Sequence, residues 1–223
     1  MASEAHSEVL DLFLELAAIP SPSGEEQVVA NRVTAYLRDL ALKPERDEAG
    51  NVLARIDASD ANGGTSIFLC AHMDTVPVSG PIEPVVEDGV VRNSADTILG
   101  ADDKAAVAVL LQAARTLLSE RRRHAGIELL FTVREETGLE GAKAFDHTRL
   151  GARTGYVYDY SGQVGDVVVA APSARQIDVA FRGRPAHAGI APEEGRSAVF
   201  AAAKAVADLR LGRIDEETTA NVG

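Results

Sequence analysis

The segment that most constrains the fold is a short apolar run that ends in a histidine and an acid. Residues 67–71 carry no charge, and His72, Met73 and Asp74 follow them directly. Such a run predicts a buried strand of an α/β sheet, in which ligands bind beyond the carboxyl ends of the strands. In extended backbone His72 and Asp74 point the same way, so the acid can orient the imidazole as it does behind a metal ligand. A plain surface hydrogen bond explains this pair equally well.

Two more apolar runs end in acids. Residues 127–133 predict a second buried strand, which is followed by Glu135 and Glu136. Residues 155–158 predict a third buried strand, which is followed by Asp159. A solvated turn is the usual interpretation of an acidic pair, but the buried strand before Glu135 and the glycine just after the pair favour a site.

A fourth segment adds another acidic pair. Asp102 and Asp103 open a helical stretch that extends to residue 118. Adjacent acids repel each other, and a shared cation offsets that repulsion. The sequence therefore predicts that four segments bring a histidine or acids to one edge of a single sheet.

Six stretches together resemble the co-catalytic di-zinc exopeptidases, a family that includes peptidase T, carboxypeptidase G, succinyl-diaminopimelate desuccinylase and aminoacylase. In chain order they are AHMDTVP (71–77), LGADDKAA (99–106), REETGLEGA (134–142), YDYSG (158–162), GRPAHAGIAPEEGRSA (183–198) and GRIDEETTANVG (212–223). The LGADDKA form and the final TTANVG are most similar to peptidase T and its relatives. The resemblance implies an α/β fold: a mixed-sheet zinc exopeptidase catalytic domain with helices on both faces, plus the start of a smaller α+β lid and dimerisation domain.

The resemblance also implies a site for two zinc ions. His72 would bind one zinc, and Asp159 would complete the ligands of that ion. Asp102 would bridge both zincs and precede an unusual peptide link to Asp103, while Glu136 would bind the second zinc. Two such ions lie about 3.5–4 Å apart, polarise a peptide carbonyl and activate a shared water.

Three further residues take catalytic roles by the same resemblance. Asp74 would orient His72, and Glu135 would be the general base that takes the proton of the water and passes it to the leaving amine. His187 would belong to the lid domain and approach the substrate carbonyl, from the neighbouring subunit of a homodimer. From its residues alone, the PAHAG segment could equally place His187 in an ordinary turn.

One feature departs from the family pattern. Relatives take a last zinc ligand, a histidine, from a segment well beyond the lid domain, whereas this sequence ends at Gly223. His6, His124 and His147 do not fill the gap, because each lies in a polar or helix-end setting that predicts a surface position. We therefore expect this chain to be the first part of a longer enzyme, with one zinc site incomplete.

Composition narrows the class of protein. The 34 acidic residues outnumber the 22 basic ones, which argues against nucleic acid or an anionic membrane as a partner. The amino terminus lacks the basic region of a signal peptide, and no span for a membrane is evident. Cys70 is the only cysteine and falls in a predicted strand, so we expect a core residue and no disulfide. These features favour a cytoplasmic enzyme.

The remaining pattern outlines two domains. Apolar spacing predicts helices over residues 9–17 and 105–118, and Ser23 to Glu26 forms a capping-box sequence before a helix that extends to about residue 40. Residues 52–56 predict a strand and residues 85–92 a hairpin that turns at Asp88-Gly89. The pattern changes near residue 172 and ends in a helical run at 198–209. We place a catalytic domain at 1–172 and an incomplete lid and dimerisation domain at 173–223.

The predicted function is zinc-dependent hydrolysis of a terminal peptide bond in small peptides, as in an aminopeptidase or tripeptidase. One alternative is an amidohydrolase that acts on N-acyl amino acids with the same metals. Another is a metal-binding or dimerising protein without catalysis. Glu135 discriminates against the last alternative, because a non-catalytic relative does not need a base beside the ligand Glu136.

Overall fold

The computed structural model describes residues 2–59, 64–171 and 173–223, with the backbone alone for residues 2–7. The chain divides into two compact units, Met1–Ser161 and Gly162–Gly223. This division falls earlier in the chain than the domain boundary predicted at residue 172, which itself lies outside the described residues. The position of the functional boundary stays a prediction.

A five-stranded mixed sheet forms the centre of the first unit. Its strands, in spatial order, are β1 (Glu45–Arg46), β2 (Val52–Ile56), β6 (Ile127–Thr132), β3 (Ile67–His72) and β7 (Thr154–Val157). Strand β3 is parallel to both of its neighbours, β6 and β7, whereas β2 is antiparallel to β1 and β6. Because β3, β6 and β7 are parallel, their carboxyl ends lie at the same edge of the sheet.

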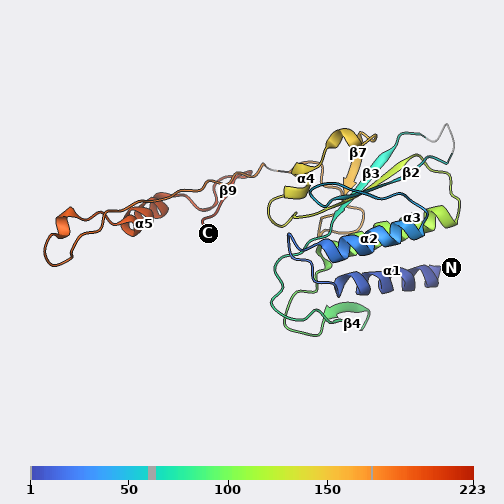
Figure 1. Ribbon diagram of the computed structural model, residues 1–223, viewed down its shortest axis with the longest axis horizontal. Coiled ribbons are helices and arrows are strands. Elements are labelled where there is room, and N and C mark those ends of the chain that lie inside the picture. The colour runs from blue at the N-terminus through green and yellow to red at the C-terminus, as the bar shows by residue number, and fades with distance from the viewer. Residues whose placement is uncertain (1, 60–63, 172) are drawn as a thin grey trace. The chain divides into compact units, whose positions relative to one another are not determined.

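Three helices cover one face of the sheet. They are α1 (Ala2–Ala17), α2 (Gln27–Asp39) and α3 (Ala101–Ser119). Helices α2 and α3 contact the strands, and α1 packs against α3 (Figure 1). Alternate strand residues such as Ala54, Phe131 and Ala71 face these helices and are fully buried in the main core. This period of two is the pattern of a strand with one face on a core.

The opposite face carries a smaller core. Its buried members are Leu53, Cys70, Leu130 and Phe145. Phe145 directly follows the short helix α4 (Glu140–Ala144), so this face is covered by α4 and the segment after it. Cys70 is buried as the sequence predicts, and its burial raises the pKa of its thiol to about 12. The predicted α/β fold, a mixed sheet with helices on both faces, is confirmed.

Most predicted elements form near their expected positions. The hairpin predicted at 85–92 is the pair β4 (Pro84–Glu87) and β5 (Val90–Asn93). Its turn residues Asp88 and Gly89 have φ angles of 50° and 78°, and a two-residue hairpin turn of type I′ requires positive φ at both positions. Among the described residues, no helix combines the length and apolarity needed to cross a membrane.

The burial predicted for residues 155–158 is wrong. Strand β7 is the edge strand of the described sheet, and Tyr156 and Val157 leave 47% and 65% of their surface exposed. The apolar run predicted the strand correctly. Whether that strand has neighbours on both sides depends on other segments, which a local pattern does not reveal.

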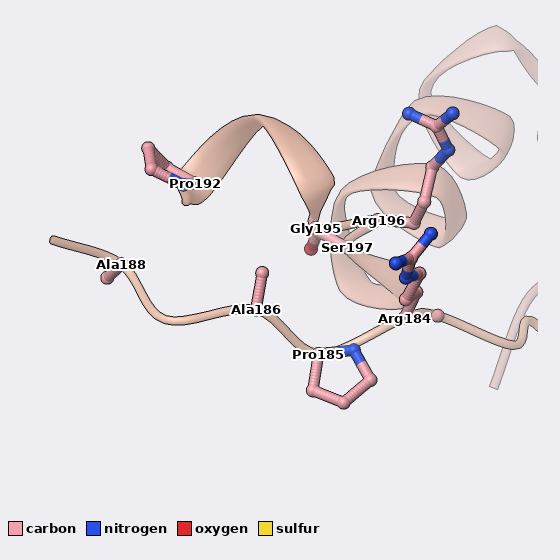
Figure 2. A pocket seen from close by; sticks show the side chains of 9 residues that line it. Arg184, Pro185, Ala186, Ala188, Pro192, Gly195, Arg196 and Ser197 are labelled. Carbon is pink, nitrogen blue, oxygen red and sulfur yellow. The ribbon is translucent and has the colours of Figure 1, made fainter. Parts of the chain in front are cut away.

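The second unit contains short elements of both kinds. These are the 3₁₀ turn η2 (Pro192–Glu194), the helix α5 (Ala198–Asp208) and the paired strands β8 (Gly212–Arg213) and β9 (Thr219–Ala220). Ser197 caps α5, because its Oγ accepts the backbone N–H of Phe200 at 3.0 Å. Arg184 and Arg196 pair through their backbones and line an open pocket of about 550 Å³ (Figure 2).

Strand β7 packs a glycine against an aromatic ring, and this contact yields a stability prediction. Gly155 pairs with Phe68 across β3 and β7, and a Cβ atom at position 155 would overlap the Phe68 ring. We expect Gly155→Ala to lower the free energy of unfolding by about 1–3 kcal/mol, because the ring must shift from its place in the smaller core. Urea unfolding would measure the loss.

Gly151→Ala is the matched control, because a Cβ there would lie 3.9 and 4.0 Å from the two Glu128 carboxylate oxygens, an ordinary contact distance. In a Phe68→Leu background the penalty of Gly155→Ala should shrink. An equal penalty in both backgrounds would contradict the overlap as its cause.

Candidate metal centre

The site is built at the carboxyl edge of the three parallel strands. His72 is the last residue of β3, Glu135 and Glu136 follow β6, Asp159 follows β7, and Asp102 lies in the first turn of α3. Side-chain donor atoms form two groups in which all members lie within 4.8 Å of one another. One group is His72, Glu135 and Glu136, and the other is His72, Asp102 and Asp159. The structure thus brings together the acids and the histidine that the sequence placed at one edge.

His72 presents one ring nitrogen to this cluster and the other to its own strand end. Its Nε2 lies 3.1 Å from Oδ1 of Asp102. Its Nδ1 lies 3.0 Å from the backbone oxygen of Asp74 and 3.3 Å from Oδ1 of the same residue. The contacts of Nδ1 with Asp74 fix the tautomer and the direction of the ring, which leaves Nε2 for a metal.

The carboxylate of Asp74 is completely buried and collects several donors. Its Oδ1 accepts the backbone N–H of Glu135 at 2.9 Å, and its Oδ2 accepts that of Glu136 at 3.1 Å. Oδ2 also accepts the hydroxyl of Ser23 at 2.7 Å. Burial alone would raise the pKa of Asp74, but hydrogen bonds from His72, Ser23 and the two backbone N–H groups hold that pKa down to about 2. Asp74 is therefore a permanent anion that joins β3 to the turn after β6.

The capping box predicted at Ser23 to Glu26 is wrong. Helix α2 begins at Gln27, and its N-cap residue, Glu26, makes no side-chain capping hydrogen bond. The Ser23 hydroxyl donates to Asp74 instead, and Oε1 of Glu26 accepts the backbone N–H groups of Gly24 and Arg134. Both side chains thus contact residues more than fifty positions away along the chain, which a local pattern does not reveal.

The start of α3 is irregular where the acids stand. Gly100 precedes the helix in a left-handed conformation with φ of 72°, and the peptide bond between Asp102 and Asp103 is cis. The Asp102 side chain is 72% exposed beside His72. Asp103 is buried, and its Oδ2 accepts the backbone N–H of His72 at 3.2 Å. Burial raises the pKa of Asp103 to about 8.

Lys104 is a buried residue that the sequence did not single out for the site. Its side chain is fully buried, and its Nζ donates to the backbone oxygen of Ile19. Burial lowers the pKa of Lys104 to about 8. This hydrogen bond ties the first turn of α3 to the end of α1, beside the acids. The signal available in the sequence was its place in LGADDKAA.

The charges of the cluster favour a bound cation. Burial lowers the pKa of His72, but its hydrogen bond to Asp74 and the charges of nearby acids outweigh that effect and raise the pKa to about 9. Burial, together with the neighbouring acids, raises the pKa of Glu135 and of Glu136. Four acids share this cluster with a single imidazole, so a divalent cation would relieve their repulsion. An imidazole nitrogen with carboxylate oxygens is a donor set that zinc accepts, so the residues fit a metal.

The other histidines lie away from this cluster or outside the described side chains. His147 is exposed, as predicted, in the turn η1 (His147–Arg149). His124 is half-buried rather than fully at the surface, and its Nδ1 lies 2.8 Å from the backbone oxygen of Ala125. The side chain of His6 lies outside the described residues. His187 belongs to the second unit, where its Nδ1 accepts the backbone N–H of Gly189 at 3.1 Å.

An α/β sheet that gathers a histidine and acids beyond its parallel strands defines the metallopeptidase class of fold and site. Residues 51–168 match the model of peptidase family M28, and residues 170–223 match the peptidase dimerisation domain. The chain belongs to peptidase family M28. The resemblance seen in the six sequence stretches is confirmed.

Relatives of known sequence or structure agree with this placement. The Bacillus subtilis protein YqjE is 40% identical over 96% of this chain and 60% of its own length. The crystal structure of aminopeptidase PepT from Bacillus cereus is 39% identical with a TM-score of 0.79, over 97% of this chain and 60% of its own. A tripeptidase structure from Staphylococcus aureus is 35% identical with a TM-score of 0.84, over the same shares. The chain thus spans about 60% of the length of these relatives.

The contact between Ser23 and Asp74 predicts an effect on metal affinity. Ser23→Ala removes one donor from the buried carboxylate that orients His72. We expect the affinity for zinc to fall by up to about tenfold, because loss of the direct partner of a metal ligand costs about 10- to 100-fold and Ser23 acts one hydrogen bond further away. Competition with a chromophoric chelator would measure it.

Ser119→Ala is the control, because its hydroxyl donates to the backbone of Thr116 at the exposed end of α3. Wild-type zinc affinity in Ser23→Ala would contradict the role given to this hydrogen bond.

Proposed function

We propose that this protein is a metal-dependent exopeptidase that hydrolyses a terminal peptide bond of small peptides. One observation carries the proposal: His72 shares a cluster of donor atoms with four acids at the carboxyl edge of the sheet. The aminopeptidase and the tripeptidase among its relatives support the choice of small peptides and favour the amino-terminal bond.

The residues that would hold the metals all belong to the two groups of donor atoms. We propose that His72, Asp102 and Asp159 hold one zinc ion, and that Glu136 and Asp102 hold a second. Asp102 suits a bridging role, because its Oδ1 lies 3.1 Å from His72 and its charge also raises the pKa of Glu136. The proposal gives two zinc ions to each complete chain.

The acids around the cluster suggest how the hydrolysis proceeds. Bound zinc ions would polarise the peptide carbonyl and lower the pKa of a water molecule. Glu135 would take the proton of this water and pass it to the leaving amine. Its raised pKa suits this task, because a base that later acts as an acid works best when its pKa lies closer to the working pH. Asp74 would hold His72 and the backbone of Glu135 in place throughout.

The second unit supports a homodimer and a role for His187. Residues 170–223 match a peptidase dimerisation domain, and we propose that two copies of the chain associate through it. Nδ1 of His187 accepts a hydrogen bond from Gly189, so the neutral ring carries its proton on Nε2. His187 is exposed, so this N–H group is available to donate to the oxyanion that develops on the substrate carbonyl.

A substrate panel tests the proposed function. The protein expressed from its full reading frame should release the amino-terminal residue of trialanine, and amino-terminal acetylation should block the release. Chelation should abolish the activity and added zinc should restore it, because the donor groups are assigned to metal. Hydrolysis of N-acetyl amino acids with no hydrolysis of trialanine would replace the peptidase by an amidohydrolase. Zinc binding without hydrolysis of either would leave a non-catalytic metal protein.

Substitutions of the adjacent acids should separate their two roles. Glu135→Gln should lower kcat by at least about 100-fold while zinc stays bound, because the variant loses the base but keeps every proposed metal ligand. Glu136→Gln should weaken zinc binding, because it removes a carboxylate ligand. Metal content after dialysis and kcat at saturating zinc would measure both effects. Loss of zinc in Glu135→Gln, with activity restored by excess zinc, would show that the two assignments are exchanged.

A further inference from the structure

The turn that carries Glu135 and Glu136 is held in an unusual way. Four consecutive backbone N–H groups, from Val133 to Glu136, donate to side chains rather than to a neighbouring strand or helix. The acceptors are Oδ1 of Asn51 at 3.1 Å, Oε1 of Glu26 at 3.0 Å, Oδ1 of Asp74 at 2.9 Å and Oδ2 of Asp74 at 3.1 Å. All three acceptor side chains are buried.

Glu26 occupies the second place in this series. Its side chain is 6% exposed, although Glu is rarely buried without partners. Oε1 accepts the N–H of Gly24 at 2.8 Å as well as that of Arg134. The carboxylate thus connects the linker before α2 to the residue directly before Glu135.

The residue that Glu26 holds has a backbone conformation that needs support. Arg134 has φ of 52°, in the left-handed region that a non-glycine residue adopts at a cost. An N–H group held by a buried acceptor stabilises this conformation. The direction of the chain at this turn is therefore fixed by Glu26, which accepts the N–H group of Arg134, and by Asp74, which accepts those of Glu135 and Glu136.

We propose that Glu26 is a positioning residue for the candidate site: its buried carboxylate orients Glu135 and Glu136 through the Arg134 N–H group. This inference rests on the proposed function for the roles of Glu135 and Glu136. It adds a residue that touches neither substrate nor metal, in a segment whose sequence resembles a helix cap.

Three substitutions at this position separate an acceptor role from a general contribution to folding. Glu26→Asp keeps the charge but shortens the side chain by one methylene, so it loses the reach to Arg134. Glu26→Gln keeps Oε1 as an acceptor and loses the charge. Glu25→Ala is the matched control, because Glu25 is the adjacent acid and is exposed.

The experiment uses the protein from its full reading frame. Zinc affinity, the visible absorption spectrum with Co²⁺ in place of zinc, kcat and KM for trialanine, and the thermal midpoint without metal would be measured. We expect Glu26→Asp to lose about 10- to 100-fold in zinc affinity or in kcat, to alter the Co²⁺ spectrum and to leave KM nearly unchanged. Glu26→Gln should stay within about fivefold of the wild type, and Glu25→Ala should match it.

Two results would overturn the proposal. One is a Glu26→Asp variant with a lowered thermal midpoint but wild-type affinity, spectrum and kcat, which would make Glu26 a structural residue only. The other is a Glu26→Gln variant as impaired as Glu26→Asp, because the acceptor atom would then not matter. If the wild type hydrolyses no peptide, the proposed function fails, while zinc affinity and the Co²⁺ spectrum still decide the role of Glu26.

Discussion

The carboxylate of Asp74 is the interaction on which the rest of the first unit depends. A charge without solvent access is strongly unfavourable unless hydrogen bonds replace the lost water. Here those bonds come from the ring of His72, from Ser23 and from the two backbone N–H groups after β6. Satisfying this one anion therefore fixes the ends of two parallel strands and the linker between α1 and α2 relative to one another. The geometry of the candidate site follows from the same contacts.

The acids of the candidate metal site differ from Asp74 in how many hydrogen-bond donors they have. Asp74 has enough donors, which hold its pKa down to about 2, whereas the acids in front of it have too few, and the pKa values of Glu135 and Glu136 are raised. One buried acid is thus satisfied by the protein, and a group of more exposed acids remains to be satisfied by a cation. The first unit thus separates one anion that the protein itself stabilises from a group of acids that can bind a metal.

The sequence pattern was sufficient to predict those strands and turns that neighbouring residues determine. The strands at 52–56, 67–72 and 127–132 follow from largely apolar runs, and the hairpin at Asp88-Gly89 follows from its turn residues. The failures concern partners that lie far away in sequence. Ser23 and Glu26 form a helix-cap sequence, but Ser23 donates to Asp74 and Glu26 accepts from Arg134 instead. The exposure of β7 depends on which strands lie beside it.

The adjacency of Glu135 and Glu136 makes the backbone network necessary rather than incidental. The two side chains are chemically identical and lie in the same group of donor atoms, so nothing in the carboxyl groups themselves separates a base from a ligand. Their directions are set by the peptide planes before each residue, and the N–H groups of these planes donate to the two oxygens of one carboxylate. Rotation of either plane would break a hydrogen bond to a buried anion, which costs more than the loss of an exposed one. The two hydrogen bonds to Asp74 therefore restrict the arrangement of the chain between these neighbouring acids.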